Sequence, residues 1–140
     1  MTFHLNDFVP YRLNIAAAQV SRRFAALYKT EAGLSIPEWR VLAHLNGSGA
    51  LSVRDIVAKV NLEKSVVSRA ADSLSQASYL AKSLHTQDQR LVALELTEQG
   101  RDLMQRLGRI AEDFQTELLI ELGVDGDAFS RALTRLVESK

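Results

Sequence analysis

The sequence predicts a mainly α-helical fold with one small β-hairpin. Apolar residues recur at helical steps over most of the 140 residues. Two short helical segments follow Ser52 and are separated by a break at Asn61. Two strand-like runs, 79–84 and 91–96, come next and surround a polar tip. Helix, turn, helix and hairpin in this order predict a winged helix-turn-helix.

The first predicted helix runs from Tyr11 to about Ala32. Pro10 suits its first turn, Gly33 ends it, and the apolar residues between them recur at helical steps. A helix of this size is about 30 Å long, and it is preceded by further apolar residues, namely Phe3, Leu5, Phe8 and Val9. This much apolar surface favours contact with a partner chain, although packing within the same chain would also account for it.

The next helix begins at a predicted capping box, in which the side chains of Ser35 and Glu38 each bond the backbone amide of the other. We expect this helix to end at about Leu45, because residues 46–49 (Asn-Gly-Ser-Gly) are typical of a turn. Residues 50–51 are then expected to form a short strand that pairs with the hairpin.

The helix-turn-helix follows this strand. Ser52 can cap its first helix through the hydroxyl, and Asn61 interrupts the apolar periodicity. The second helix begins near Glu63, and its spacing points four residues inward: Val67, Ala70, Ala71 and Leu74. The other faces of this helix carry Lys64, Ser65, Ser68, Arg69, Asp72 and Ser73.

The outward surface of this second helix has the chemistry of a DNA-reading surface. Small side chains allow a helix to approach another surface closely, and Ser, Lys and Arg donate hydrogen bonds to phosphates and base edges. We therefore predict that this helix enters the major groove of duplex DNA. The residues expected to contact DNA are Lys64, Ser65, Val66, Ser68 and Arg69.

The two strand-like runs form the predicted wing. In the second run Val92, Leu94 and Leu96 alternate with other residues, as in a half-buried strand. The tip carries Arg90, and Asp88 is close enough in sequence to orient its guanidinium. An arginine on a protruding tip suits a narrow minor groove. A solvated turn with an incidental ion pair is the alternative.

Two more helices are predicted after the wing. Thr97 can cap a helix that starts near Glu98 and continues to about Leu122, with apolar residues along one side. Residues 123–127 (Gly-Val-Asp-Gly-Asp) are expected to form a loop. The last predicted helix covers residues 128–137.

Length and composition favour one domain, because 140 residues with 46% hydrophobic content can bury a substantial core. No apolar run approaches the roughly 18 residues of a membrane span. The N-terminal sequence lacks a basic region followed by an apolar one, so we expect a cytoplasmic protein. The absence of cysteine excludes disulfides and thiolate metal sites, and neither a cofactor nor a metal is expected.

The formal net charge is zero, which argues mildly against a nucleic-acid partner, so its distribution matters more. Residues 1–51 hold five Lys/Arg and three Asp/Glu, and residues 52–90 hold six and four. Residues 91–140 hold six and ten, so the C-terminal third is the acidic part. This distribution permits DNA binding by the central segment.

The sequence gives less support to two other classes of function. An enzyme is disfavoured because His4, His44 and His85 are isolated and no phosphate-cradling or nucleophile motif occurs. A winged helix that binds protein instead of DNA remains the alternative, since the net charge is zero.

Four segments in this order resemble the MarR (multiple antibiotic resistance regulator) family. They are residues 34–45 (LSIPEWRVLAHL), 51–57 (LSVRDIV), 64–74 (KSVVSRAADSL) and the wing pattern of Asp88, Arg90, Leu96, Thr97 and Gly100. The chain departs from many relatives at Gln89, where they are basic, so its wing offers a single arginine.

The resemblance implies a homodimer that regulates genes by binding a pseudo-palindromic operator in double-stranded DNA, most simply as a ligand-responsive repressor. It implies one MarR-type domain over residues 1–140. Residues 1–33 and 98–140 would supply the dimerisation helices, and residues 34–97 the DNA-binding lobe. No membrane partner is expected.

The resemblance also implies a small aromatic or anionic effector bound between the dimerisation helices and the lobe. The sequence can place apolar and cationic or titratable residues around that junction, the mixture that an anion with a ring requires. Each of these residues could instead have a purely structural role. Trp39 could belong to the hydrophobic core, and Arg40 could form an ion pair with an acidic side chain. The candidate pocket residues are Tyr11, Arg12, Ile15, Trp39, Arg40 and His44.

Overall fold

The computed structural model describes residues 2–84 and 92–139. The chain divides into two compact units, Met1–Leu107 and Gly108–Lys140. The predicted helix-turn-helix and wing strands lie in the first unit. The predicted division into a lobe and two sets of dimerisation helices stays a prediction.

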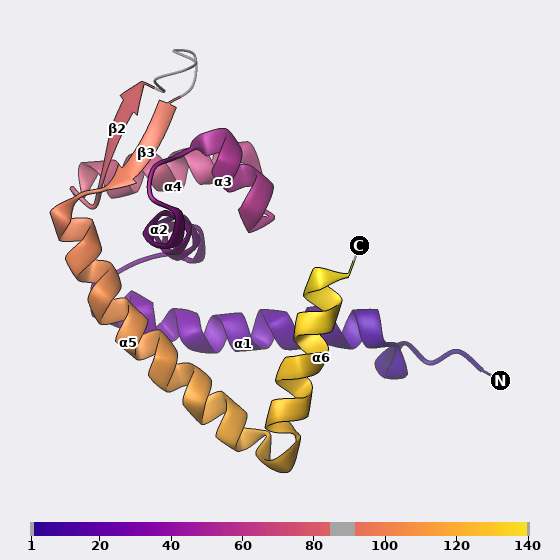
Figure 1. The fold of residues 1–140 in the computed structure, drawn as a ribbon. Helices are drawn as coiled ribbons and strands as arrows, with labels where there is room; N and C mark the ends of the chain where they lie inside the picture. Colours follow the sequence, from indigo (N-terminus) through magenta and orange to yellow (C-terminus); the bar gives the residue numbers. More distant parts are fainter. Residues whose placement is uncertain (1, 85–91, 140) are drawn as a thin grey trace. The chain divides into compact units, whose positions relative to one another are not determined.

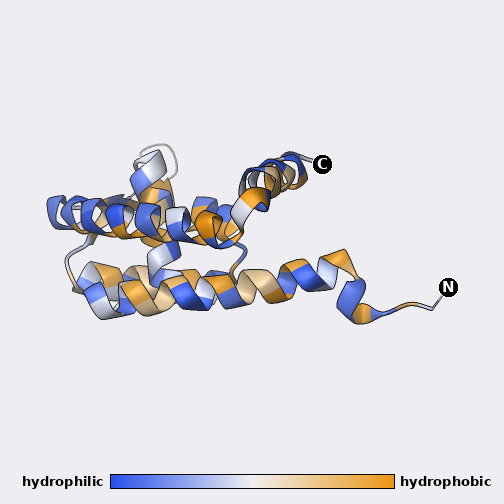
Figure 2. Ribbon diagram, turned by 90° about the horizontal axis from the view of Figure 1, so that it is seen from below, coloured by the Kyte–Doolittle hydropathy of each residue, from blue (hydrophilic) through white to orange (hydrophobic). Residues whose placement is uncertain are grey.

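Helix α1 covers Val9–Ala32 and begins two residues earlier than expected, with Pro10 in its first turn. It ends at Gly33, whose φ of 68° is left-handed and whose N–H donates to the Lys29 carbonyl. A 3-10 turn, Leu5–Asp7, precedes it. Hydrophobic residues appear along α1 as far as its N-terminal end (Figure 2), and Phe8, Val9, Leu13 and Ile15 are among those exposed in this chain.

Helix α2 covers Ile36–Ser48, and the capping box predicted at its start is present. The Ser35 N–H donates to Glu38 Oε1 at 2.8 Å, and the Glu38 N–H donates to Ser35 Oγ at 3.3 Å. The predicted end at Leu45 was wrong, because the helix continues through Asn46, Gly47 and Ser48. It stops at Gly49, where a φ of 75° suits glycine alone among ordinary residues.

Helices α3 (Val53–Val60) and α4 (Lys64–Gln76) form the helix-turn-helix. Ser52 caps α3 as predicted, and Asp55 completes a second capping box with bonds of 3.0 Å in each direction. Asn61 ends α3 in the left-handed region at φ 55°, a conformation that asparagine tolerates better than most residues.

The wing is part of a three-stranded antiparallel sheet with the order β1-β3-β2. Its strands are β1 (Leu51–Ser52), β2 (Leu80–Leu84) and β3 (Val92–Leu96). Leu51 pairs with Leu94, so the short strand predicted before α3 is present, shifted by one residue. In β3, Leu94 and Leu96 are buried, whereas Val92 at the outer end is exposed.

The core of the first unit lies among α2, α3, α4 and the sheet, which gather together in Figure 1. Helix α1 adds Tyr28, and the first turns of α5 (Glu98–Glu121) add Leu103 and Leu107. The other side chains with the least exposed surface are Val41, Leu42, Leu45, Ile56, Val67, Leu74 and Leu94. The core is thus aliphatic around α4, the helix predicted to read DNA.

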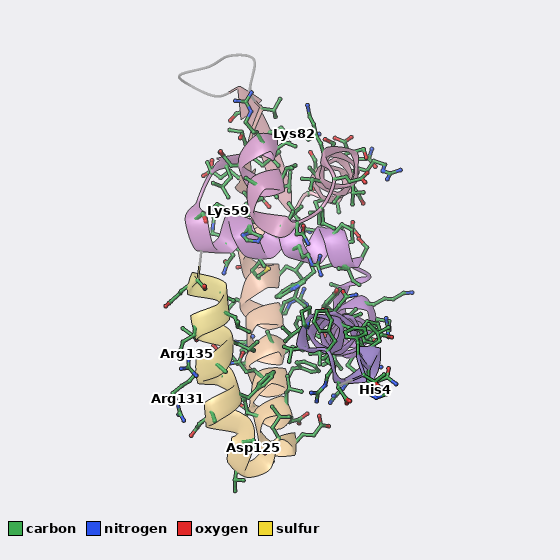
Figure 3. All side chains as sticks on the ribbon, turned by 90° about the vertical axis from the view of Figure 1, so that its right-hand side faces the viewer. His4, Lys59, Lys82, Asp125, Arg131 and Arg135 are labelled. Atoms are coloured by element: carbon green, nitrogen blue, oxygen red, sulfur yellow. The ribbon has the colours of Figure 1, made fainter. Side chains whose placement is uncertain are left out.

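Helix α5 starts after Thr97, which caps it as predicted: its hydroxyl accepts the Gly100 N–H at 3.0 Å. In the second unit a 3-10 turn, Gly123–Asp125, leads into α6 (Gly126–Glu138). The predicted loop at 123–127 was therefore too long, because α6 begins two residues earlier than expected. Arg131 and Arg135 project from the same side of α6 in Figure 3, one helical turn apart.

None of the helices in the described residues combines the length and the apolar character that a membrane crossing requires.

Candidate nucleic-acid interface

Helix α4 has two clearly different sides. The four residues predicted to point inward, Val67, Ala70, Ala71 and Leu74, are all buried. Lys64, Ser65 and Arg69 are exposed, and Val66 and Ser68 are half-buried. The inner side therefore fixes the helix on the core, while the predicted reading side remains available to a partner.

The N-terminal part of α4 carries positive charge. Residues 64–71 include two cations and no carboxylate, and the helix begins where the Glu63 carbonyl accepts the N–H groups of Val66 and Val67 at 3.1 Å. The first turn of a helix also presents unpaired N–H groups. Anionic groups such as DNA phosphates are therefore favoured at this end of α4.

The C-terminal part of α4 is bonded to two neighbouring elements through consecutive residues. Asp72 forms an ion pair with Lys82 of β2, and Figure 3 labels Lys82 on that strand. The Ser73 hydroxyl donates to Glu38 Oε2 of α2 at 2.8 Å. Neither of these two contacts was predicted from the sequence, because pairs so far apart along the chain leave no local signal.

The wing strands are paired over five residues, from Leu80 opposite Leu96 to Leu84 opposite Val92. This register confirms the predicted hairpin. Asp88 and Arg90, expected at its tip, lie outside the described residues, as does His85. The minor-groove contact assigned to Arg90 therefore stays a prediction.

A cluster of three aromatic rings joins α1 to α2. Trp39 stacks on Tyr28 with 5.5 Å between ring centroids and 17° between ring planes. Phe24 meets both rings edge-on, at 5.1 Å from each. Trp39 is half-buried in this cluster, which agrees with the core alternative considered for it.

Burial raises the pKa of the Tyr28 phenol above its usual value, and the positive charge of Arg40 acts in the opposite direction. Arg40 therefore lies close enough to the aromatic cluster to influence it electrostatically. It is half-buried on α2, as is His44 one turn later.

Four of the residues predicted for a ligand pocket line two different hollows. Tyr11, Arg12 and Ile15 line a hollow of about 420 Å³ along α1. Arg40 lines a second hollow of about 500 Å³ between α1 and the lobe, together with Asn14, Ala17, Ala18, Ser21, Arg22, Ile36 and Asn61. The second hollow contains two guanidinium groups and no acidic side chain, so it has the chemistry of an anion site.

Arg22 and Asn61 come to this second hollow from α1 and from the end of α3, and neither was predicted as a pocket residue. A signal for Arg22 exists in the helical spacing, since it lies four residues after Ala18 on α1. The position of Asn61 depends on the turn between α3 and α4. Within the described residues, no group of three His, Asp or Glu side chains could hold a metal ion.

Comparison with known proteins identifies the lobe. A model of the MarR family matches residues 32–91, the segment that holds α2, α3, α4 and β2. The uncharacterized HTH-type transcriptional regulator YfiV of Bacillus subtilis is 29% identical over 121 residues, covering 76% of this chain and 75% of YfiV. A MarR family transcriptional regulator from Silicibacter pomeroyi has TM-score 0.82 and 29% identity, covering 96% of this chain and 88% of that chain. The chain therefore resembles the MarR family in sequence and in fold.

The MarR resemblance and the predicted mainly α fold with a small wing are therefore confirmed. A further structural neighbour is Bordetella bronchiseptica BpsR, a protein whose DNA binding is regulated by 6-hydroxynicotinic acid. The TM-score is 0.78 with 22% identity, over 100% of this chain and 99% of BpsR. At this identity the likeness to BpsR shows the shared fold. YfiV and the Silicibacter pomeroyi protein are named as transcriptional regulators, and this chain shares the winged-helix fold of the latter.

Proposed function

We propose that this protein is a transcriptional regulator of the MarR type, which binds a specific pseudo-palindromic sequence in duplex DNA as a homodimer and represses transcription there. The observation that carries the proposal is the division of α4 into a fully buried apolar side and an exposed side with Lys64, Ser65 and Arg69. A helix held in this way presents its polar side chains to the major groove.

Each exposed residue of α4 receives a distinct role. Ser65, Val66 and Arg69 face base edges, with Arg69 suited to a bidentate contact with guanine. Lys64 and Ser68 contact bases or phosphates near the N-terminal end of α4. Arg90 reaches the flanking minor groove, where a single arginine prefers A·T-rich sequence.

Dimerisation is supported by apolar surface that each unit leaves exposed. In the first unit Phe3, Leu5 and Phe8 are exposed near α1, and the rings of Phe3 and Phe8 pack edge-on at 5.4 Å. In the second unit Phe129, Leu136 and Val137 are exposed on α6. Two copies related by a two-fold axis would cover such surfaces and would place two α4 helices on successive major grooves.

A small aromatic or anionic effector is proposed to release the dimer from DNA. The hollow lined by Arg22, Arg40 and Asn61 supports this proposal, because its two cations favour an anion and Asn61 lies in the turn between α3 and α4. The regulation of BpsR by 6-hydroxynicotinic acid shows that a relative of the same fold responds to such a compound. The effector must bind more tightly to the lobe arrangement that does not fit DNA.

The test of DNA binding starts from a library of random duplexes, from which the purified protein selects by repeated binding. We expect a pseudo-palindrome with half-sites about one helical turn apart to be enriched. Its affinity should fall steeply with salt, because phosphate contacts release counterions. If no duplex is enriched and none is shifted at low salt, the proposal is wrong and the protein-binding winged helix takes its place.

The test of the effector is calorimetric titration of 6-hydroxynicotinate and salicylate into the protein, with and without the selected duplex. Coupling is reciprocal, so the duplex should weaken effector binding by the factor by which the effector weakens DNA binding, typically about 5- to 150-fold. An Arg40→Ala variant should lose the effector response. Equal effector affinity in the two titrations would show that the compound is not an effector.

A further inference from the structure

The recognition helix α4 rests on the core through a shallow apolar surface. Two of its four buried residues, Ala70 and Ala71, have the smallest apolar side chains available. Apolar contacts of this kind are non-directional, so they hold α4 against the core without strongly fixing its rotation about its own axis. Directional bonds must therefore contribute to the angle at which Arg69 is presented.

The two bonds at the C-terminal part of α4 have the geometry for this task. Asp72 is paired with Lys82 of β2, and Ser73 donates to Glu38 of α2 at 2.8 Å. Consecutive residues point about 100° apart around a helix. One bond therefore pulls α4 towards the wing and the other towards α2, so that rotation in either direction would stretch one of them.

Glu38 is itself held in place before it meets α4. Its Oε1 accepts the Ser35 N–H at 2.8 Å in the capping box, and its Oε2 accepts the Ser73 hydroxyl. A single carboxylate thus joins the first turn of α2 to α4, and its two oxygens have separate partners. Because the cap fixes the Glu38 rotamer, the position of Ser73 is tied to the rigid start of α2.

Ser73 lies one helical turn after Arg69, on the same side of α4. Glu38, Arg69 and Ser73 also line one hollow of about 300 Å³ between α2 and α4. A rotation of about 10–20° is enough to take a functional side chain out of its productive geometry. The hydrogen bond between Glu38 and Ser73 therefore lies close to Arg69, the side chain whose direction is most important for base recognition.

We infer that Glu38 and Ser73 are positioning residues for DNA recognition, which set the rotation of α4 and hence the direction of Arg69 without touching DNA themselves. This inference rests on the proposed function, since it concerns how sequence is read. It assigns to the Glu38 carboxylate a role beyond capping α2.

The chain offers matched serine variants to separate these two roles. Ser73→Ala removes the donor to Glu38 and leaves the capping box intact, whereas Ser35→Ala removes the cap oxygen and leaves the bond to Ser73. Ser73→Thr retains a hydroxyl and serves as the conservative rescue. Ser73 is exposed, so its replacement leaves no buried polar group unpaired.

The measured quantity is the ratio of dissociation constants for a scrambled duplex and for the duplex selected by the wild-type protein, at one salt concentration. Ser73→Ala should lower this ratio roughly three- to tenfold, the effect of losing one hydrogen bond to a charged group near the surface. Binding to the scrambled duplex should be unchanged, because phosphate contacts need no precise rotation. Ser73→Thr should restore the ratio, and Ser35→Ala should lower thermal stability while leaving the ratio at its wild-type value.

A double variant tests whether the bond acts through Arg69. In an Arg69→Ala background, Ser73→Ala should cause no further loss of selectivity. The inference is overturned if Ser73→Ala leaves the ratio unchanged, if it weakens both duplexes equally, or if its loss adds fully to that of Arg69→Ala. If the wild-type protein selects no duplex at all, the proposed function fails and this inference fails with it.

Discussion

The ring of Tyr28 stacks on the ring of Trp39, with 5.5 Å between their centroids and 17° between their planes. Tyr28 comes from α1 and Trp39 from α2, so this stack joins the terminal helix to the DNA-binding lobe. Tyr28 is only 2% exposed. The stack therefore contributes apolar burial and a preferred ring geometry at the same place.

Trp39→Ala should destabilise the protein by about 3 kcal/mol, because it removes a large ring from the cluster and leaves a cavity beside Tyr28. Urea denaturation followed by circular dichroism measures this change. Val124→Ala, at a position that is 99% exposed, is the matched control and should change stability by less than about 0.5 kcal/mol. A Trp39→Ala variant as stable as that control would show that the stack does not hold α1 on the lobe.

Tyr28 should make the stability of the protein sensitive to alkaline pH. Burial raises its pKa above the ordinary value of 10.0, so the folded state holds the phenol proton more tightly than the unfolded state does. This contribution is complete below pH 10 and is lost as the pH rises through the folded-state pKa. Urea denaturation at a series of pH values should show that Tyr28→Phe loses less stability above pH 10 than the wild type. Parallel curves for the two proteins would contradict the assigned shift.

Gly100→Ala should be strongly destabilising, because a methyl group there would lie 2.0 Å from the Tyr79 carbonyl oxygen, a backbone atom that cannot move aside cheaply. A loss of about 3 kcal/mol is expected from such overpacking. Gly108→Ala is the control in the same helix, since nothing lies within 4 Å of the added atom. It should stabilise α5 by up to about 1 kcal/mol through helix propensity. The prediction fails if thermal denaturation places both variants at the same midpoint.

The inner side of α4 was predictable from sequence because helical periodicity alone fixes which of its residues face the core. The capping box of Ser35 and Glu38 was predicted because it lies within four consecutive residues. At the start of α3 only the Ser52 cap was predicted, and the structure adds Asp55 to it. The end of α2 was not predictable at Asn46 to Ser48, because a turn-like sequence continued the helix until Gly49 took a left-handed φ. Glu38 and Ser73 are 35 positions apart, so only the packing of α2 against α4 brings them together.

Two residues of α4 are expected to contact DNA in different ways, Arg69 at a specific base and Lys64 in a largely sequence-independent manner. Arg69→Ala should cost about 1–3 kcal/mol in affinity for the selected duplex and should relax specificity at one base position. Lys64→Ala should weaken all duplexes more evenly and reduce the salt dependence. Fluorescence anisotropy with selected and scrambled duplexes distinguishes the two patterns. Unchanged affinity of Arg69→Ala for the selected duplex would place the reading surface elsewhere.

Leu136→Glu should dissociate the proposed homodimer, because a carboxylate would then be buried at the interface without a partner. Leu136 is 57% exposed in the single chain, so the fold of α6 itself should tolerate the change. Light scattering at micromolar concentration should give a dimer mass for the wild type and a monomer mass for the variant. Arg131→Ala, on the polar side of α6, should remain dimeric. A monomeric wild type would exclude the proposed mode of assembly.

The two capping boxes have a consequence for the order in which the lobe folds. Ser35 with Glu38 and Ser52 with Asp55 are local signals, so α2 and α3 can begin to form before distant parts of the chain meet. The sheet is different, because Leu51 must find Leu94 across 43 positions, and closing such a loop costs entropy before any contact repays it. We therefore expect the helices to be present early in folding and the pairing of β1 with β3 to complete the lobe.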